Sequence, residues 1–474
     1  MGVYIVKEKS GYRYLFNNIG LLTLSNFATK FLSFFLVPLY TNVLTTTEYG
    51  TYDLFNATIG VLLPILTLNI QESVLRFSLD KKTSKEAIVT VGVKYLLISN
   101  MLVITGLFLN GITNLNQMIA EYGIYFFLMF LMQSLVGVIT SYITGIDRVA
   151  DLSVSSVITS IVTIGCNIIF LVAFKWGLPG YFLANIIGPL AQCIYLIIRS
   201  KFLKQVRFLQ FSVEEEAMTN YSKPLIANSI AWWVNNVSDR YIIVFFCGLA
   251  ENGIYSVAGK IPSILNIFQT IFNQAWTLSA VKDFDPEDNN GFFSNTYKAY
   301  NCMMVIVCSS IIVADKLLAK FLYAKDFYIA WKYVPWLTIA ILFGALSGYL
   351  GGFFSAVKNS KLFATSTIMG AIINVVLNLI FTPLYGAIGA AVATAISYFV
   401  VWAFRYCQSK KYIKMRINIT RDIVSYILLI MQSILILING LKMYIFVGLV
   451  FVIICLLYLN DIILVINKFL KRGI

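Results

Sequence analysis

The 474-residue sequence contains no histidine and few charged residues. Without histidine, the chain lacks the usual general base, a common metal ligand and the side chain that most readily exchanges a proton near neutral pH. Charged residues make up 12% of the chain and hydrophobic residues 59%, whereas ordinary soluble domains are roughly one quarter charged. A soluble core cannot bury so much apolar surface, so the composition excludes a water-soluble enzyme and predicts a polytopic membrane protein.

Motifs for disulfides, metal ions and nucleotides are also missing. No C-x-x-C pair occurs, and no G-x-x-x-x-G-K-[ST] loop is present, so ATP is not expected to drive the protein. We expect no cofactor, which leaves a proton or sodium gradient as the energy source. The cysteines are predicted to be free, small hydrophobic residues. They are Cys166, Cys193, Cys247, Cys302, Cys308, Cys407 and Cys455.

Long apolar runs, separated by charged and turn residues, predict an all-α membrane protein with about 14 transmembrane helices. The runs are continuous rather than alternating, which disfavours a transmembrane β-barrel. The expected spans are 20–44, 52–70, 87–110, 119–144, 152–174, 178–199, 224–248, 252–280, 295–315, 334–357, 362–383, 386–406, 422–439 and 443–466.

The distribution of Lys and Arg predicts the orientation of these spans. With a cytoplasmic N-terminus, the expected inner segments together with the inner ends of the spans hold 26 of the 36 basic residues, the outer loops hold six and the interiors of the spans hold four. Inner loops of membrane proteins carry this kind of excess, so both termini are predicted to be cytoplasmic in a bacterial plasma membrane. The net charge of +14 is then explained by contacts with anionic lipids, and nucleic acid is not expected as a partner.

Two short patterns suggest an internal duplication. An E-x-G-x-Y pattern at 48–52 recurs at 251–255, an offset of 203 residues. Near the end of each proposed copy, 167–170 resembles 378–381, and Gly177, Gly180 and Ala184 correspond to Gly386, Gly389 and Ala393. Six spans per copy give parallel lobes around a central cavity. We therefore expect an N-terminal lobe over 1–210, a C-terminal lobe over 211–410 and two added helices over 411–474.

Polar residues within the expected spans mark the candidate substrate cavity, because charges at this depth are costly unless they are paired or hydrated. Lys30 lies near the middle of the first span, with Asn26 on the same face. In the seventh span, Arg240 extends a row that includes Trp232 and Asn236, and Asp239 points about 100° away, so the two charges are not expected to neutralise each other. In the eighth span, Lys260 and Asn266 belong to a polar face expected to look inward.

Three further charged residues have a structural explanation beside the functional one. Glu72 and Arg76 have the i,i+4 spacing of an ion pair, and they are either a structural clamp or, with Asp239, candidates for ion coupling or gating. Lys94 lies near the inner membrane boundary, where its ammonium is expected to reach the surface. No catalytic or metal-binding group is predicted.

Several of these motifs resemble the oligosaccharide flippases of polysaccharide biosynthesis (the Wzx type), in the superfamily that also contains multidrug antiporters and the peptidoglycan-lipid flippase. The resemblance covers roughly residues 10–410. It rests on 30–50 in the first span and outer turn, 71–77, 221–241 with its Trp-Trp and Ser-Asp-Arg-Tyr sequences, and 253–260. The seventh- and eighth-span segments are the most specific.

The resemblance implies translocation of undecaprenyl-diphosphate-linked oligosaccharides from the inner to the outer leaflet by alternating access, coupled to an ion gradient. Polysaccharide polymerase machinery is a further expected partner. The acidic residue that cation antiporters of the superfamily carry in their first span is absent here, where Lys30 stands instead. A small-molecule antiporter of the same fold stays as one alternative, and a membrane-bound polymerase as another.

Overall fold

A computed structural model describes residues 34–80, 83–207, 209, 211–282, 284–357, 359–438, 440–461 and 463. Its contacts divide the chain into two compact units, Met1–Trp233 (unit 1) and Val234–Ile474 (unit 2). The boundary falls inside one long helix, α9 (Ser212–Cys247). The lobe limits expected at 210 and 410 stay predictions.

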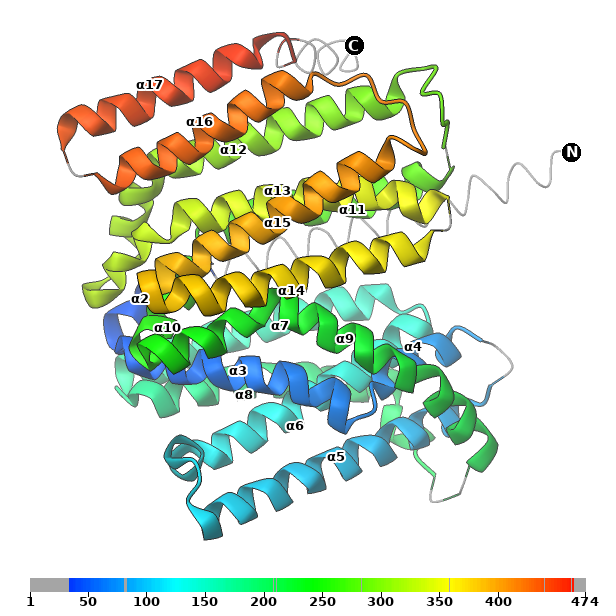
Figure 1. The fold of residues 1–474 in the computed structure, drawn as a ribbon. Helices are drawn as coiled ribbons and strands as arrows, with labels where there is room; N and C mark the ends of the chain where they lie inside the picture. Colours follow the sequence, from blue (N-terminus) through cyan, green and yellow to red (C-terminus); the bar gives the residue numbers. More distant parts are fainter. Residues whose placement is uncertain are drawn as a thin grey trace, which may run out of the picture. The chain divides into compact units, whose positions relative to one another are not determined.

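The described residues form helices and the segments that connect them (Figure 1). Unit 1 contains α2 (Val37–Val43), α3 (Thr46–Leu66), α4 (Ile70–Ser78), α5 (Lys85–Thr113), α6 (Gln117–Gly145), α7 (Val149–Asn167), the π-helix η1 (Ile168–Ala173), α8 (Gly177–Ser200), the 3₁₀ helix η2 (Phe202–Gln205) and the first part of α9. After the end of α9, unit 2 contains α10 (Leu249–Ala258), α11 (Ser263–Lys282), α12 (Phe292–Leu322), the 3₁₀ helix η3 (Lys325–Lys332), α13 (Val334–Ala356), α14 (Ser360–Tyr385), α15 (Ala387–Ser409), α16 (Ile419–Leu437) and α17 (Leu441–Leu457).

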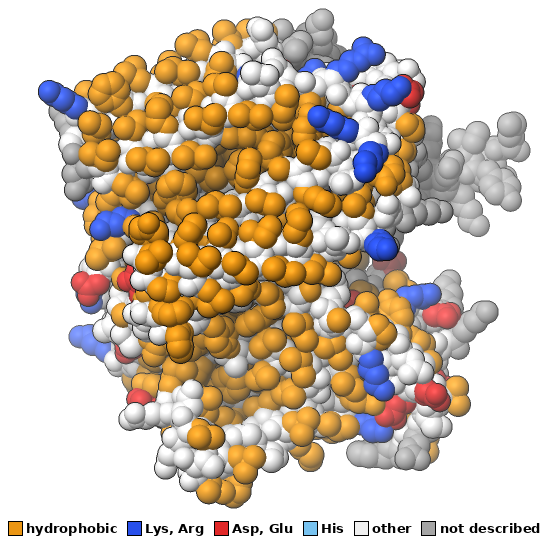
Figure 2. All heavy atoms as spheres, viewed as in Figure 1, with side chains coloured by type: hydrophobic (Ala, Val, Ile, Leu, Met, Phe, Trp, Pro, Cys, Tyr) orange, Lys and Arg blue, Asp and Glu red, His pale blue; other side chains and the backbone are white. Residues whose placement is uncertain are grey.

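The all-helical, polytopic class is confirmed. Within the described residues, nine helices are long and apolar enough to cross a membrane, or ten if α3 and α4 count as one bent span. Expected spans two to fourteen each coincide with a helix or helix pair, and most of the first lies outside the described residues. In each unit, apolar side chains cover the helix faces in view and charged side chains gather towards the helix ends (Figure 2). The chain is a multi-pass membrane protein.

Two expected spans are broken, which corrects the prediction of continuous helices. The 52–70 span includes the break between α3 and α4, which meet at 62°, and Leu68 and Asn69 at this break have positive φ angles. The 252–280 span divides into α10 and α11. Pro262 lies in the turn between them, and proline disrupts a helix because it lacks the N–H group and its ring clashes with the preceding turn.

The proposed duplication has a structural counterpart in each unit. Gly177, at the start of α8, and Gly386, immediately before α15, both have positive φ angles. A side-chain carbon on Gly180 would lie 3.0 Å from the Cβ atom of Phe170, and one on Gly389 would lie 2.2 Å from the carbonyl oxygen of Phe381. In both units, therefore, a glycine lets one helix pass close to the end of the preceding one.

The cores of the two units differ in character. In unit 1, aliphatic side chains of α4, α5 and α6, such as Val74, Ile88 and Ile139, are fully buried together. In unit 2, α13 is the most buried of the long apolar helices, and its Tyr349 stacks 4.0 Å from Trp276 of α11. The long helices α12, α16 and α17 pack together on one side of this unit (Figure 1).

Candidate functional site

The candidate site in unit 2 is centred on Asp239 of α9. This aspartate is 7% exposed. Its Oδ2 atom accepts a 2.6 Å hydrogen bond from the hydroxyl of Tyr255 in α10, and its Oδ1 atom accepts one of 2.9 Å from the backbone N–H of Arg240. A buried carboxylate of this kind needs such donors, because an uncompensated charge inside a protein is costly.

Two further helices extend this cluster. Thr394 of α15 lies close to the hydroxyl of Tyr255. The Asn374 amide of α14 donates to Thr394 Oγ1 at 3.2 Å, and the Asn378 amide donates to Asn374 Oδ1 at 3.2 Å. We call Asp239, Tyr255, Asn374, Asn378 and Thr394 the Asp239 network. Its carboxylate can bind a proton, and its carboxylate, amide and hydroxyl oxygens are the types of ligand that a hard cation prefers.

Arg240 lies beside this network. Its Nη1 atom is 3.9 Å from Asp239 Oδ1 and donates a 3.5 Å hydrogen bond to the Asn236 carbonyl. The expectation that Asp239 and Arg240 cannot neutralise each other is therefore wrong, because the long arginine side chain folds back along the helix. Asn236 is fixed by a 2.7 Å hydrogen bond that its Oδ1 atom accepts from Tyr398 of α15.

Lys260 and Asn266 are not part of one continuous polar helix face. Lys260 lies in the turn between α10 and α11, where its backbone oxygen accepts a hydrogen bond from Ser263, and Asn266 lies in the first turns of α11. Both side chains are half-buried. Within the described part of unit 2, no hydrogen bond or ion pair joins either of them to Arg240.

The other predicted site residues fall elsewhere. Trp232 belongs to unit 1 and is 63% exposed on α9. Asn26 and Lys30 lie outside the described residues. Glu72 and Arg76 are both exposed, and no ion pair between them occurs in the described structure, which corrects that expectation. Glu72 lies in the first turn of α4 and Arg76 in the last, so each charge complements the helix dipole instead.

Lys94 is exposed, which agrees with the expectation that its ammonium reaches the surface. Its Nζ atom lies 2.7 Å from Oε1 of Glu215, which also accepts a 3.0 Å hydrogen bond from the hydroxyl of Tyr95. The Lys94 ammonium, aided by Tyr95, lowers the pKa of the Glu215 carboxyl. This contact joins α5 to the beginning of α9 within unit 1.

A buried arginine in unit 2 escaped the sequence analysis. Arg405 of α15 is 4% exposed, and its guanidinium donates to Ser366 Oγ at 2.8 Å, to the Ser347 carbonyl at 2.9 Å and to Thr367 Oγ1 at 3.0 Å. The guanidinium also lies 4.3 Å from the centre of the Phe363 ring. No carboxylate is paired with it among the described residues. Its position at the end of an apolar run made it resemble an inner-loop residue.

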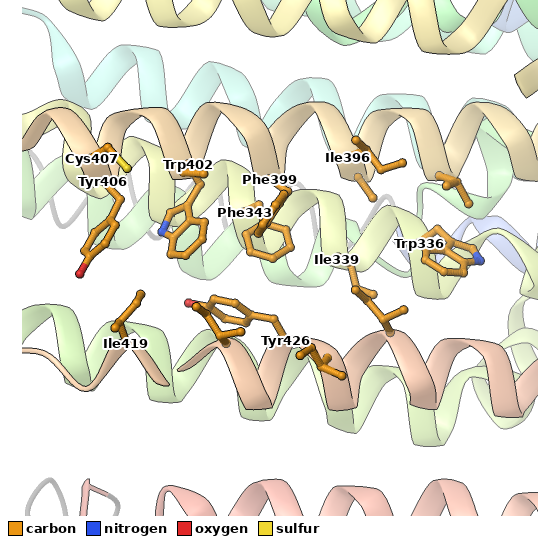
Figure 3. Close-up of a pocket in the computed structure, with 16 residues that line it drawn as sticks. Trp336, Ile339, Phe343, Ile396, Phe399, Trp402, Tyr406, Cys407, Ile419 and Tyr426 are labelled. Carbon is orange, nitrogen blue, oxygen red and sulfur yellow. The ribbon is translucent and has the colours of Figure 1, made fainter. Parts of the chain in front are cut away.

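Unit 2 also contains an apolar groove of about 380 Å³ between α13, α15 and α16 (Figure 3). Phe343 of α13 and Phe399 and Trp402 of α15 point into it from one side, and Tyr426 of α16 from the other. The Tyr426 hydroxyl donates a 2.8 Å hydrogen bond to Asn301, so its polar end is satisfied by the protein. The groove thus offers a hydrocarbon chain an almost wholly apolar surface.

Comparison with known sequences gives two matches. The family model described as "Polysaccharide biosynthesis protein" matches residues 15–278, more than half of the chain. The probable low-salt glycan biosynthesis flippase Agl15 of Haloferax volcanii is 23% identical over 189 residues. That match covers 39% of this chain and 40% of the relative, so the chain matches less than half the length of this curated relative.

Solved structures resemble the fold over most of the chain. The lipid II flippase MurJ, in an inward closed conformation, has a TM-score of 0.72 and 15% identity, with coverage of 93% of this chain and 99% of MurJ. An inward-facing multidrug resistance transporter of the MATE family and MOP superfamily has a TM-score of 0.62 and 15% identity, with coverage of 82% and 95%. At these identities the likeness is one of fold.

Proposed function

This chain belongs to the polysaccharide biosynthesis protein family, and on that basis we propose that it is a flippase. Its substrate would be an oligosaccharide linked to undecaprenyl diphosphate, moved from the inner to the outer leaflet of a bacterial plasma membrane by alternating access. The proposed orientation, with both termini in the cytoplasm, rests on the excess of Lys and Arg in the inner segments. The basic inner loops would contact anionic lipids, and polymerase machinery would receive the product.

The observation that carries the proposal is the presence in unit 2 of both environments that such a substrate requires. The apolar groove between α13, α15 and α16 suits a polyprenyl chain. The polar side chains of α9, Asn236 and Arg240, suit an anionic, hydroxylated headgroup, because arginine binds phosphate oxygens in a bidentate way. Among the predicted residues, Lys30 and Lys260 would also contact the diphosphate, and Trp232, Asn26 and Asn266 the sugars.

Ion coupling is assigned to Asp239. The Asp239 network can exchange Tyr255 and Arg240 as partners for a proton or a sodium ion, because the carboxylate accepts a hydrogen bond from Tyr255 and lies 3.9 Å from the Arg240 guanidinium. Substrate phosphate at Arg240 would weaken the 3.9 Å attraction to Asp239 and so raise the affinity of the carboxylate for a cation. Glu72 and Arg76, exposed at the two ends of α4, are secondary candidates for gating.

Complementation of a flippase-deficient bacterial strain tests the assignment. Arg240→Gln should reduce surface polysaccharide at least ~10-fold, since one charge-assisted contact contributes about 1.5–3 kcal/mol, while membrane insertion stays normal. The matched control is Lys442→Gln, an exposed residue outside the Asp239 network and the groove. Full complementation by Arg240→Gln would contradict the assignment of Arg240 to the substrate.

A cation antiporter of the same fold is the second candidate, favoured by the buried carboxylate of Asp239. It differs in its cargo: a small organic cation would bind the carboxylate directly, and Arg240 would repel it. Arg240→Gln should then strengthen drug resistance in cells that express the protein. The flippase proposal instead predicts no resistance from the wild-type chain.

A further inference from the structure

A second buried carboxylate in unit 2 lies apart from the Asp239 network. Asp315 lies in α12 and is fully buried, with a relative exposure of 0%. Asp315 is the last residue of the expected span 295–315, but α12 continues seven residues further, to Leu322. Neither of its carboxylate oxygens has a hydrogen-bond partner among the described residues.

Lys316 places a positive charge near Asp315, but no ion pair to this carboxylate occurs among the described residues. The ammonium of Lys316 lies over the ring of Trp331, at 4.3 Å. Tyr444 of α17 donates its hydroxyl proton to the Val313 carbonyl at 2.7 Å, and Tyr328 of η3 is exposed. Among the other charged residues near this end, Lys332 of η3 is half-buried, and Lys320, Lys325, Asp326 and Lys442 are exposed. Helix α13 has no charged residue, and those of α16, Arg421 and Asp422, lie in its first turn.

Another buried acid in the same group of three helices, Asp422, has partners that Asp315 lacks. Asp422 of α16, also buried, lies 3.2 Å from the Arg421 guanidinium and accepts a 3.1 Å hydrogen bond from the hydroxyl of Tyr458. Asp315 has no such donors. An ionised carboxylate without partners is strongly disfavoured in an apolar interior, so the packing observed here fits the neutral acid.

The end of α12 beyond Asp315 is tied to the helix that carries Tyr255 of the Asp239 network. The hydroxyl of Tyr333, after η3, donates to Glu251 of α10. The hydroxyl of Tyr323, at the end of α12, donates to the Ala258 carbonyl of α10 at 3.4 Å. A displacement of α10 would therefore pull on the segment that follows Asp315 in the chain.

We infer that Asp315 is a proton-exchange site, which holds a proton while α12 is packed as observed and releases it when movement of α10 and η3 admits water. The step is a simple transfer of the carboxyl proton to water, and the resulting carboxylate is hydrated. A proton rather than a metal ion is expected because the part of the chain that the structure describes contains no group of three or more acidic or cysteine side chains that could hold a metal ion. The coupling role of Asp315 rests on the proposed flippase function. The protonation of Asp315 in the packed state does not depend on that function.

Infrared spectroscopy of the reconstituted full chain tests the protonation directly. The wild type minus Asp315→Asn difference spectrum at pH 7 should contain the C=O stretch of a protonated carboxyl group. The matched control is Asp326→Asn, an exposed acid in η3, whose difference spectrum should contain carboxylate bands only. Carboxylate bands in the Asp315→Asn difference would overturn the inference. Asp315→Leu should fold with undiminished thermal stability, and a loss of stability with either variant would point to a structural role instead.

Transport in proteoliposomes tests the exchange. A pH gradient should accelerate flipping of an undecaprenyl-diphosphate glycan by the wild type, and Asp315→Asn should reduce that acceleration at least tenfold while flipping without a gradient stays within twofold. Unchanged acceleration would overturn the coupling role. If the wild type flips no glycan, the proposed function fails, and the infrared result still decides whether Asp315 is protonated.

Discussion

Units 1 and 2 each contain a close helix–helix contact at a glycine, Gly180 in unit 1 and Gly389 in unit 2. They differ in the residues that correspond to the Asp239 network. Asn167 donates to the carbonyl of residue 163, and its counterpart Asn378 donates to the carbonyl of residue 374, at 2.8 and 2.9 Å. The offset of 203 residues, however, pairs Asp239 with Leu36, and Tyr255 with Tyr52. Unit 1 thus keeps the scaffold without the carboxylate, which indicates that the fold does not require the charge.

The two tyrosines illustrate this difference. Tyr52 packs in an aromatic group, with ring centres 4.5 Å from Tyr181 and 5.8 Å from Phe182. Tyr255 instead uses its hydroxyl on Asp239. The same sequence motif therefore supports packing in one unit and a polar site in the other.

The largest effect is expected when Asp239 of unit 2 is replaced by leucine, the residue at the corresponding position of unit 1. Asp239→Leu should lower the flipping rate about 100-fold, equivalent to about 2.7 kcal/mol of lost transition-state stabilisation, because the site for the coupling ion is removed. Rates in proteoliposomes at equal protein content measure this. Since unit 1 folds with leucine at the corresponding position, the variant should still insert. A rate within threefold of the wild type would remove Asp239 from the mechanism.

The second-largest effect is expected to be the loss of stability when a methyl group is added to Gly389 or to its counterpart Gly180. Gly389→Ala should destabilise the protein by about 2–3 kcal/mol, because the new carbon meets a backbone oxygen that cannot move aside, and Gly180→Ala by about 1 kcal/mol, because it meets side-chain carbons at 3.0 Å. Thermal unfolding in detergent measures both. Equal losses would mean that the two contacts are more alike than the structure indicates.

Removing single hydroxyls tests the tyrosine comparison. Tyr255→Phe should slow flipping roughly tenfold, because Asp239 loses its 2.6 Å donor, and a hydrogen bond to a charged group contributes about 1.5–3 kcal/mol. Tyr52→Phe should stay within twofold of the wild-type rate, because its ring contacts are retained. Transport assays on the two variants side by side decide this. Similar losses would argue that both units contain functional sites.

The smallest effect concerns two surface ion pairs of equal length. Lys94–Glu215 in unit 1 and Lys414–Glu287 in unit 2 are both 2.7 Å long, but the second is more exposed at both partners. Glu215→Gln should lower the free energy of unfolding by up to about 1 kcal/mol at pH 7. Because the folded-state pKa of Glu215 is lowered, this stability is present above the ordinary glutamate pKa and disappears as the pH falls through the lowered value.

Thermal unfolding at pH 7 and pH 4 measures the pair in unit 1. The control is Glu287→Gln, which should change the stability less at pH 7. A larger loss for Glu287→Gln would reverse this part of the comparison.

The sequence predicted the helices better than it predicted the site. Apolar runs of about 20 residues place membrane helices with few alternatives, and thus α5 to α8 and α12 to α16 agree with the expected spans. The breaks at 67–69 and 259–262 were missed because hydropathy averages over a window. Pro262 was the available signal for the second break.

Within the candidate site, the charged residues of α9 were predicted, but their partners were not. Asn374, Asn378 and Thr394 are uncharged residues of apolar helices, and only the packing of four helices brings them to Asp239. The i,i+4 spacing of the two asparagines was the signal that could have suggested them. Asp315 was not recognised as buried, because a single charged residue ends an apolar run in the same way whether it is exposed or buried.

The central claim is tested most directly by measuring on which face of a vesicle a lipid-linked glycan is accessible. Purified protein is reconstituted with an undecaprenyl-diphosphate oligosaccharide in both leaflets, and an added glycosidase that cannot enter the vesicles cleaves only the outer glycans. We predict that nearly all of the glycan becomes cleavable with the wild-type chain. With Asp239→Leu, only the half in the outer leaflet should be cleaved. If the wild type also leaves half of the glycan protected, the protein does not flip this substrate.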